Sequence, residues 1–258
     1  MFNFFYELSP IYQALLAGIF TFLITLLGSS IVLFFKNVNK SILDIMLSIS
    51  AGIMLAASFF SLLNPAISIS NELKLIAWLI VFSGFISGGM FLFIGDKLIN
   101  YLNKKRCNYL SKFKRSIMLF LSITLHNIPE GLVLGVAFAS TSISSAIILT
   151  IGIAIQNFPE GSAISLPLRR DGFSPFKSFL IGSISAIVEP IFAVIGAILV
   201  LKIKLFLPFI LSFTAGAMIF VITMELIPES QTNKRKGLMA LALMIGFSIM
   251  MILELVLW

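Results

Sequence analysis

A series of long apolar runs constrains this chain more than any other feature of its sequence. A helix needs about 20 mostly apolar residues to cross a bilayer, and 59% of the 258 residues are hydrophobic while only 11% are charged. This composition, with a mean hydropathy of +1.08, places the chain in a membrane. The runs predict an all-α polytopic membrane protein, a single domain over 1–258 with eight transmembrane helices. The predicted spans are 11–35, 42–63, 75–95, 116–140, 145–168, 177–201, 205–227 and 238–258.

Basic residues are unevenly distributed among the segments that connect these spans. If the N-terminus is external, fifteen of the 18 Lys and Arg residues are cytoplasmic, with the largest group in a basic loop predicted over 96–115. Only Lys74, Lys202 and Lys204 remain outside. Because short cytoplasmic loops accumulate Lys and Arg, this bias predicts a multi-pass protein of the cell (inner or plasma) membrane with both termini external. The net charge of +7 therefore reflects topology in a lipid bilayer, and no nucleic-acid partner is expected.

Two copies of one hexapeptide pattern lie thirty residues apart inside the fourth and fifth predicted spans. They read HNIPEG at 126–131 and QNFPEG at 156–161. Helix positions i and i+4 share a face, so His126 lies above Glu130 and Gln156 above Glu160. The proline in each copy leaves the carbonyl four residues earlier without its donor. Such breaks are tolerated at membrane depth only where protein or a water-filled cavity satisfies the freed groups.

The polar residues of these motifs share one level with a third carboxylate. Counting inward from the span ends places His126, Glu130, Gln156, Glu160 and Glu189 near the bilayer midplane. The last of these is followed by proline, which predicts another helix break beside a carboxylate. An ionisable group at a helix centre costs about 2.5 to 3.5 kcal/mol, so three unpaired carboxylates would cost about 8 to 10 kcal/mol. Protonation or a bound cation is needed to offset that cost.

The histidine favours a metal over a simple proton relay. Neutral imidazole with carboxylates suits zinc and neighbouring divalent transition metals, whereas oxygen ligands alone suit magnesium or calcium. Asn127, Gln156 and Asn157 add neutral oxygen donors. The alternative is that these polar side chains only join helices by buried hydrogen bonds. Their duplication and common level favour the metal site.

On these features the chain resembles the ZIP (Zrt/Irt-like protein) family of divalent metal transporters, in particular its prokaryotic GufA-like branch. The resemblance rests on the paired motif, on Glu189-Pro190, on the segment 224–230 and on the predicted topology, and it covers essentially the whole chain. It implies a ZIP-like helical bundle that brings divalent cations into the cytoplasm. Zinc is the expected cargo, with iron, manganese and cadmium as further candidates, and a homodimer is implied. No cofactor and no enzymatic activity are expected.

The resemblance also implies a binuclear metal centre built by the fourth, fifth and sixth spans. The primary ion would be held by His126, Glu130 and Glu160. The second site would consist of Asn127, Gln156, Asn157 and Glu189, with Glu130 and Glu160 bridging the two ions. Met54 in the second span would supply a thioether contact, and Glu225 near the cytoplasmic end of the seventh span would form an exit site.

Two positions depart from the family pattern. The fifth-span motif of the family often begins with histidine followed by an acid, where this chain has Gln156 and Asn157. Each change lowers donor strength or negative charge, so weaker binding of the second ion is expected. Met224 stands where the family commonly has histidine or an acid, which leaves the exit site to Glu225 and Glu229.

Two other functions compete with metal transport. A proton-coupled carrier of another substrate would use the glutamates as a proton relay with His126 as titrating partner. An intramembrane metallohydrolase would use a metal to activate water, but the chain has no His-Glu-x-x-His motif. A zinc finger is excluded because Cys107 is the only cysteine.

Overall fold

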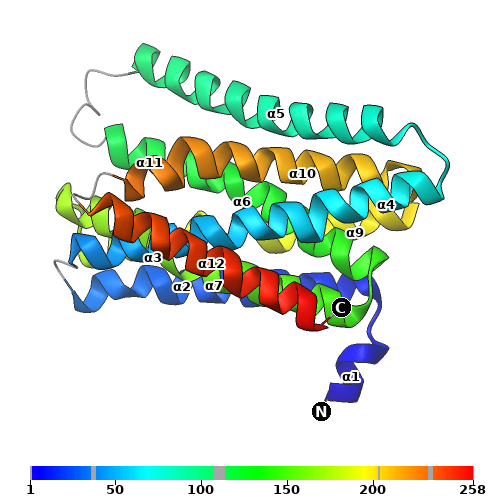
Figure 1. The fold of residues 1–258 in the computed structure, drawn as a ribbon. Coiled ribbons are helices and arrows are strands. Elements are labelled where there is room, and N and C mark those ends of the chain that lie inside the picture. The colour runs from blue at the N-terminus through cyan, green and yellow to red at the C-terminus, as the bar shows by residue number, and fades with distance from the viewer. Residues whose placement is uncertain (1, 36–38, 107–113, 203, 232–234, 258) are drawn as a thin grey trace.

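The computed structural model describes residues 2–35, 39–106, 114–202, 204–231 and 235–257, and within these ranges the regular structure is entirely helical (Figure 1). The side chains of some helical residues, His126 among them, lie outside the description. The α-helices are α1 (Phe2–Glu7), α2 (Pro10–Phe34), α3 (Lys40–Ala57), α4 (Asn64–Glu72), α5 (Ala77–Arg106), α6 (Lys114–Ser140), α7 (Ile143–Arg170), α8 (Pro175–Ile184), α9 (Val188–Lys202), α10 (Leu207–Val221), α11 (Ile227–Ser230) and α12 (Lys236–Leu257). Three short segments have other helical forms: the π-helices η1 (Ser58–Leu63) and η3 (Ile222–Leu226), and the 3-10 helix η2 (Lys204–Phe206).

Seven helical segments of the described chain are long and apolar enough to cross a membrane. They cover 10–34, 41–72, 77–98, 143–170, 175–202, 207–230 and 236–255. They confirm the prediction of an all-α polytopic membrane protein. The predicted fourth span is helical as α6, but it is not among the seven, so the total of eight stays a prediction.

Two helices extend beyond their predicted ends. The second span runs on through α4 to Glu72, and α5 continues to Arg106, through half of the segment 96–115 that was expected to be a loop. Residues 96–106 contain neither glycine nor proline and are rich in Lys, Leu and Asn. Nothing in them stops a helix once it has begun, because only glycine and proline carry a large helical penalty. The drop in hydropathy after residue 95 therefore marks the membrane boundary, whereas the helix itself continues to Arg106.

The long helices run roughly parallel or antiparallel, and both termini lie at one end of the bundle together with the turn that joins α4 to α5 (Figure 1). The most extensive contacts divide the helices into two groups. In one group α2, α6, α7 and the α8–α9 span pack together, while in the other α5 packs on α10 and α3 packs on α12. The groups meet chiefly where α3 contacts α7 and where α10 contacts α6.

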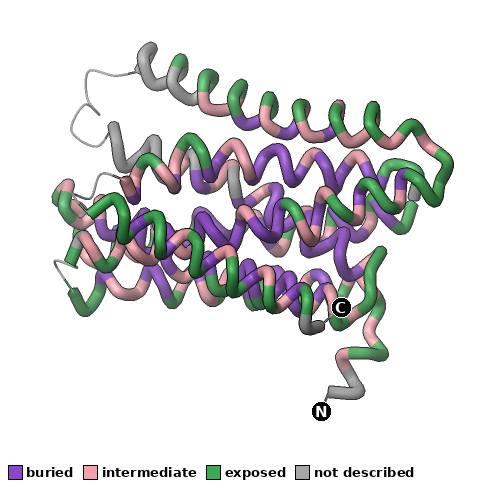
Figure 2. The backbone as a smooth tube through the Cα atoms, in the orientation of Figure 1, coloured by how far each residue is buried: buried purple, intermediate pink, exposed green. Residues whose placement is uncertain are grey.

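Burial is concentrated in the middle of the bundle, as Figure 2 shows. In its most apolar window α7 is 78% buried, whereas the corresponding window of α5 is 17% buried and presents its apolar side chains outward. Close helix packing depends on glycine: a Cβ on Gly28 of α2 would lie 1.9 Å from the carbonyl oxygen of Phe158 on α7. The second motif is therefore pressed directly against α2.

Candidate metal centre

The sixth span is interrupted immediately before Glu189, as the following proline predicts. Pro190 has no N–H to donate, and the Glu189 N–H bonds to the Ala186 carbonyl at 3.0 Å in a tightened turn. An unbroken helix would direct this N–H to the Ser185 carbonyl. That carbonyl instead accepts a hydrogen bond from Asn127 Nδ2 at 3.0 Å, so the first motif on α6 is tied to the break.

The motif prolines act differently. Both α6 and α7 continue as helices through Pro129 and Pro159, so the breaks expected there are not helix ends. A proline within a helix removes one backbone bond, and neighbouring helices can supply substitutes in a membrane. Ser29 of α2 and Ser50 of α3 contact other carbonyls of the second motif and do not replace the bond lost at Pro159: Ser29 donates to the Gly161 carbonyl at 3.1 Å and Ser50 to the Gln156 carbonyl at 3.4 Å.

Three carboxylates converge in the middle of the bundle. Glu130 and Glu189 are fully buried and Glu160 is 1% exposed. The Glu130 and Glu160 carboxylates both lie close enough to repel the Glu189 carboxylate. The helices that carry Glu130 and Glu189 pack closely, because a Cβ on Gly131 of α6 would lie 2.5 Å from the Glu189 carbonyl oxygen. The structure thus brings together the three carboxylates that the sequence places at one level.

Amides from the second motif hydrogen-bond two of these carboxylates. Gln156 Nε2 donates to Glu130 Oε1, and Asn157 Nδ2 donates to both oxygens of Glu189 at 3.0 and 2.9 Å. Both amides are fully buried. They therefore contribute to the centre as hydrogen-bond donors, whereas the sequence predicted only oxygen ligands from them.

The oxygens of three buried amides have no hydrogen-bond donor within the described chain. Asn127 Oδ1, Gln156 Oε1 and Asn157 Oδ1 are buried and accept no hydrogen bond in the part of the chain that the structure describes. A buried polar atom without a partner costs free energy, which a cation ligated by that oxygen would recover. With the carboxylates they make an oxygen-rich donor set for a divalent ion.

The predicted ligand set is described only in part. The backbone of His126 lies in α6, one turn before Glu130, but its side chain is outside the described residues. Among described side chains, no three of His, Cys, Asp and Glu are grouped closely enough to hold a metal ion by themselves. The individual ligands therefore stay a prediction.

Met54 and Glu225 lie on other spans. Met54 is fully buried on α3, one turn beyond Ser50, whose hydroxyl contacts the Gln156 carbonyl. Residues one turn apart share a helix face, so Met54 lies on the side of α3 that carries this contact. Glu225 is half-buried in η3, which packs against α3 and α10.

The sequence reasoning missed a contact from the first span. Thr21 of α2 is fully buried beside Glu189, and its hydroxyl donates to the Gly18 carbonyl at 3.1 Å. Thr21 lies one turn beyond Gly18, where a Cβ would lie 2.6 Å from the Cα of Pro190. A hydroxyl in an apolar span carries no signal of its partner, although the glycine one turn earlier marks close helix contact.

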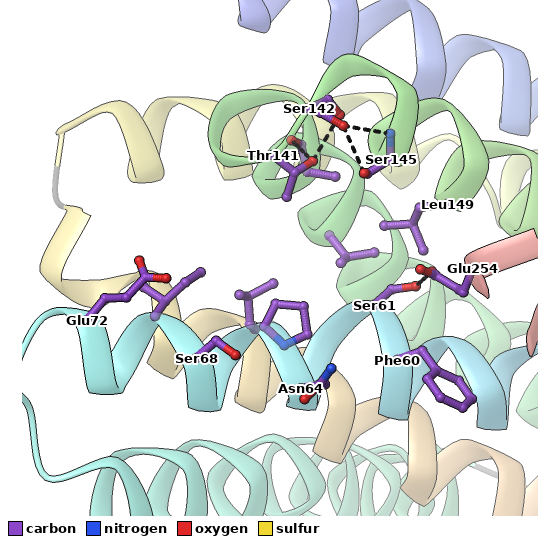
Figure 3. A pocket seen from close by; sticks show the side chains of 15 residues that line it. Phe60, Ser61, Asn64, Ser68, Glu72, Thr141, Ser142, Ser145, Leu149 and Glu254 are labelled. Carbon is purple, nitrogen blue, oxygen red and sulfur yellow. Dashed lines mark hydrogen bonds between the residues drawn. The ribbon is translucent and has the colours of Figure 1, made fainter. Parts of the chain in front are cut away.

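A pocket of about 430 Å³ opens between the centre and the end of the bundle that holds the termini (Figure 3). Its polar lining includes Asn64, Glu72 and Glu254, and Ser61 donates a hydrogen bond to Glu254. Val133 also lines the pocket; it follows Glu130 by three residues, which is about 4.5 Å along the axis of α6. The pocket therefore leads from exposed Glu72 at the bundle end, past buried Glu254, toward the centre.

Sequence similarity to known proteins shows the family of this chain. Residues 103–254 match the family described as "ZIP Zinc transporter". The chain is 35% identical to zinc transporter ZIP11 of Bos taurus, over 95% of this chain and 97% of that protein. It is 34% identical to zinc transporter ZIPB of Bordetella bronchiseptica, over 93% of this chain and 80% of that protein, and 32% identical to zinc transporter GufA of Myxococcus xanthus, over 67% and 70%. The chain therefore belongs to the ZIP zinc transporter family, whose members are membrane transporters and not enzymes.

Proposed function

We propose that this protein moves divalent transition-metal cations, zinc foremost, across the cell membrane into the cytoplasm through the centre formed by Glu130, Glu160 and Glu189. The convergence of three carboxylates at 0 to 1% exposure carries the proposal. Buried carboxylates at membrane depth are costly, and a divalent cation offsets that cost while leaving them ionised. Iron, manganese and cadmium prefer overlapping sets of nitrogen and oxygen ligands, so they are included as candidate cargo.

The ligand roles that we propose are those that the resemblance to the ZIP family implies. His126, Glu130 and Glu160 hold the primary ion, and Glu130 and Glu160 bridge to a second ion. The second site also draws on Glu189 and on the buried amide oxygens of Asn127, Gln156 and Asn157, which accept no hydrogen bond within the described chain. Since amides carry no charge, the second ion binds more weakly than the first.

The path of the ion follows the axis of the bundle. Exposed Glu72 lines the pocket at the end that holds the termini, and a carboxylate at a pocket mouth raises the local concentration of cations. We assign this end to the outside, because the opposite end carries most of the basic residues. Glu225, on the span that reaches that opposite end, receives the ion before release.

Uptake by proteoliposomes tests this function. Purified protein should take up zinc from a panel of zinc, iron, manganese and cadmium, and Glu160→Ala should abolish uptake because a bridging carboxylate supplies both ligation and charge. Glu7→Ala is the matched control, since Glu7 is exposed at the end of α1. Glu7→Ala should transport at the rate of the unmodified protein. Repeating the assay with and without a pH gradient separates metal transport from transport of another substrate driven by protons.

Full transport by Glu160→Ala at equal protein content would contradict the assigned centre. Uptake of none of the four metals by the unmodified protein would contradict the function itself.

A further inference from the structure

Two neighbouring amides of α7 each donate hydrogen bonds to a different carboxylate of the centre. Gln156 donates to Glu130, and Asn157 donates to Glu189, so consecutive residues of α7 reach carboxylates on two different spans. The four side chains are all fully buried. These contacts cross between helices, and therefore depend on how α6, α7 and α9 are packed together.

A cation and an amide donor compete for the same oxygen atoms. Asn157 Nδ2 lies at 3.0 and 2.9 Å from the two oxygens of Glu189, which is the position that a metal bound by both oxygens would take. The amide oxygens of both residues accept no hydrogen bond from any described residue. An N–H that lies against a carboxylate oxygen occupies the space that a cation bound to that oxygen needs, so the amide donor has to move when the cation binds.

We propose that Gln156 and Asn157 hold Glu130 and Glu189 by hydrogen bonds when no cation is bound, so that the carrier can cross the membrane empty. This inference rests on the proposed function. A carrier that delivers metal must return without it, with its carboxylates enclosed away from water. In that enclosed form only internal donors can satisfy the carboxylates, because no water reaches them. When metal binds, the ion takes over the carboxylates and the amide donors are released.

Thermal unfolding of purified protein tests the proposal without any transport measurement. Gln156→Leu removes the donor to Glu130, so in chelator it should lower Tm by about 5 °C, as expected for a lost hydrogen bond to a buried charge. Saturating zinc should restore most of this loss, because the ion satisfies Glu130 directly. The shift in Tm caused by zinc should thus be larger in Gln156→Leu than in the unmodified protein.

Gln13→Leu is the control for the substitution itself. Gln13 is a buried amide on α2 that donates to the Phe5 carbonyl at 2.9 Å, away from the carboxylates. Its replacement should change Tm equally with chelator and with zinc. If Gln156 serves only as a metal ligand, Gln156→Leu will instead keep its Tm in chelator and show a smaller zinc shift than the unmodified protein, which would overturn the proposal.

Flux measurements provide a second readout if Gln156→Leu folds poorly in detergent. Net zinc uptake requires the empty carrier to return, whereas exchange of external zinc for internal zinc requires only the loaded carrier to cross. Gln156→Leu should lower net uptake about tenfold more than it lowers exchange. Equal losses in both modes would overturn the proposal. Failure of the proposed function would look different, because the unmodified protein would then show neither a zinc shift in Tm nor zinc flux.

Discussion

Glu189 illustrates how a single buried carboxylate is positioned by side chains from several helices. Asn157 of α7 donates to both of its oxygens, and Thr21 of α2 lies beside it. The backbone of Glu189 is fixed by its own bond to the Ala186 carbonyl at the break. The carboxylate thus has its orientation set by α2 and α7 as well as by its own span.

We expect Thr21→Val to lower the initial rate of zinc uptake about tenfold, because the change preserves shape but removes the polar group that lies beside the buried Glu189 carboxylate. Thr25→Val is the matched control: Thr25 is also buried on α2, and its hydroxyl donates to the Thr21 carbonyl at 3.3 Å. Thr21→Ser keeps a hydroxyl and should restore most of the rate. The initial rates of zinc uptake by these variants are compared in proteoliposomes. An equal loss of rate in Thr25→Val would show that only helix packing is affected.

The sequence predicted that Glu130, Glu160 and Glu189 share one level, but not how their side chains are held. The motif period and the common level of Glu130, Glu160 and Glu189 depend on helix geometry, which is visible in a sequence. The direction in which Gln156 and Asn157 turn their amides depends on the packing of three spans, which is not visible. Thr21 was missed for the same reason, since its partner lies far away in the chain.

At the scale of elements, the membrane segments followed from hydropathy, but their internal irregularities did not. Both π-helical segments stand just before a proline, η1 before Pro65 and η3 before Pro228. In each, the last turn is widened: the Asn64 N–H bonds to the Phe59 carbonyl and the Ile227 N–H to the Ile222 carbonyl. One extra residue in a turn leaves no trace in a continuous apolar run, so periodicity cannot reveal it.

The contact between α2 and α7 should not tolerate added volume. Gly28→Ala should lower Tm by about 5 °C, because its Cβ would lie 1.9 Å from the Phe158 carbonyl oxygen and backbone must move to admit it. Gly237→Ala is the control at the start of α12, where a Cβ meets nothing within 4 Å. That substitution should keep or raise Tm, since alanine favours a helix by about 1 kcal/mol over glycine. Unfolding followed by circular dichroism in detergent measures both, and an unchanged Tm in Gly28→Ala would contradict the close packing.

The whole molecule is polarised along its long axis. Glu72, Thr141 and Glu254 line one pocket at the end that holds the termini, and acidic side chains are the charged groups of that lining. At the opposite end, α7 finishes with Arg169 and Arg170. This polarity matches the direction proposed for the ion, from an acidic mouth through a buried centre to a basic face.

Cysteine labelling tests both the orientation and the number of spans. In a Cys107→Ser background, single cysteines replace four residues that are exposed at the helix ends: Thr141, Lys202, Arg170 and Lys236. An impermeant maleimide added to intact cells should modify Thr141→Cys and Lys202→Cys, because the positive-inside bias places their end of the bundle outside. Arg170→Cys and Lys236→Cys should react only after the membrane is permeabilised.

The two external positions report on different helices. Thr141 follows α6 directly, so its labelling from outside requires α6 to cross the membrane and supplies the eighth span, which is not among the seven found in the described helices. Lys202 ends α9 and tests orientation independently of α6. Protection of Thr141→Cys with labelling of Lys202→Cys would remove α6 from the spans and with it the membrane depth of Glu130. Labelling of only Arg170→Cys and Lys236→Cys in intact cells would reverse the orientation, and the acidic pocket would then face the cytoplasm as an exit.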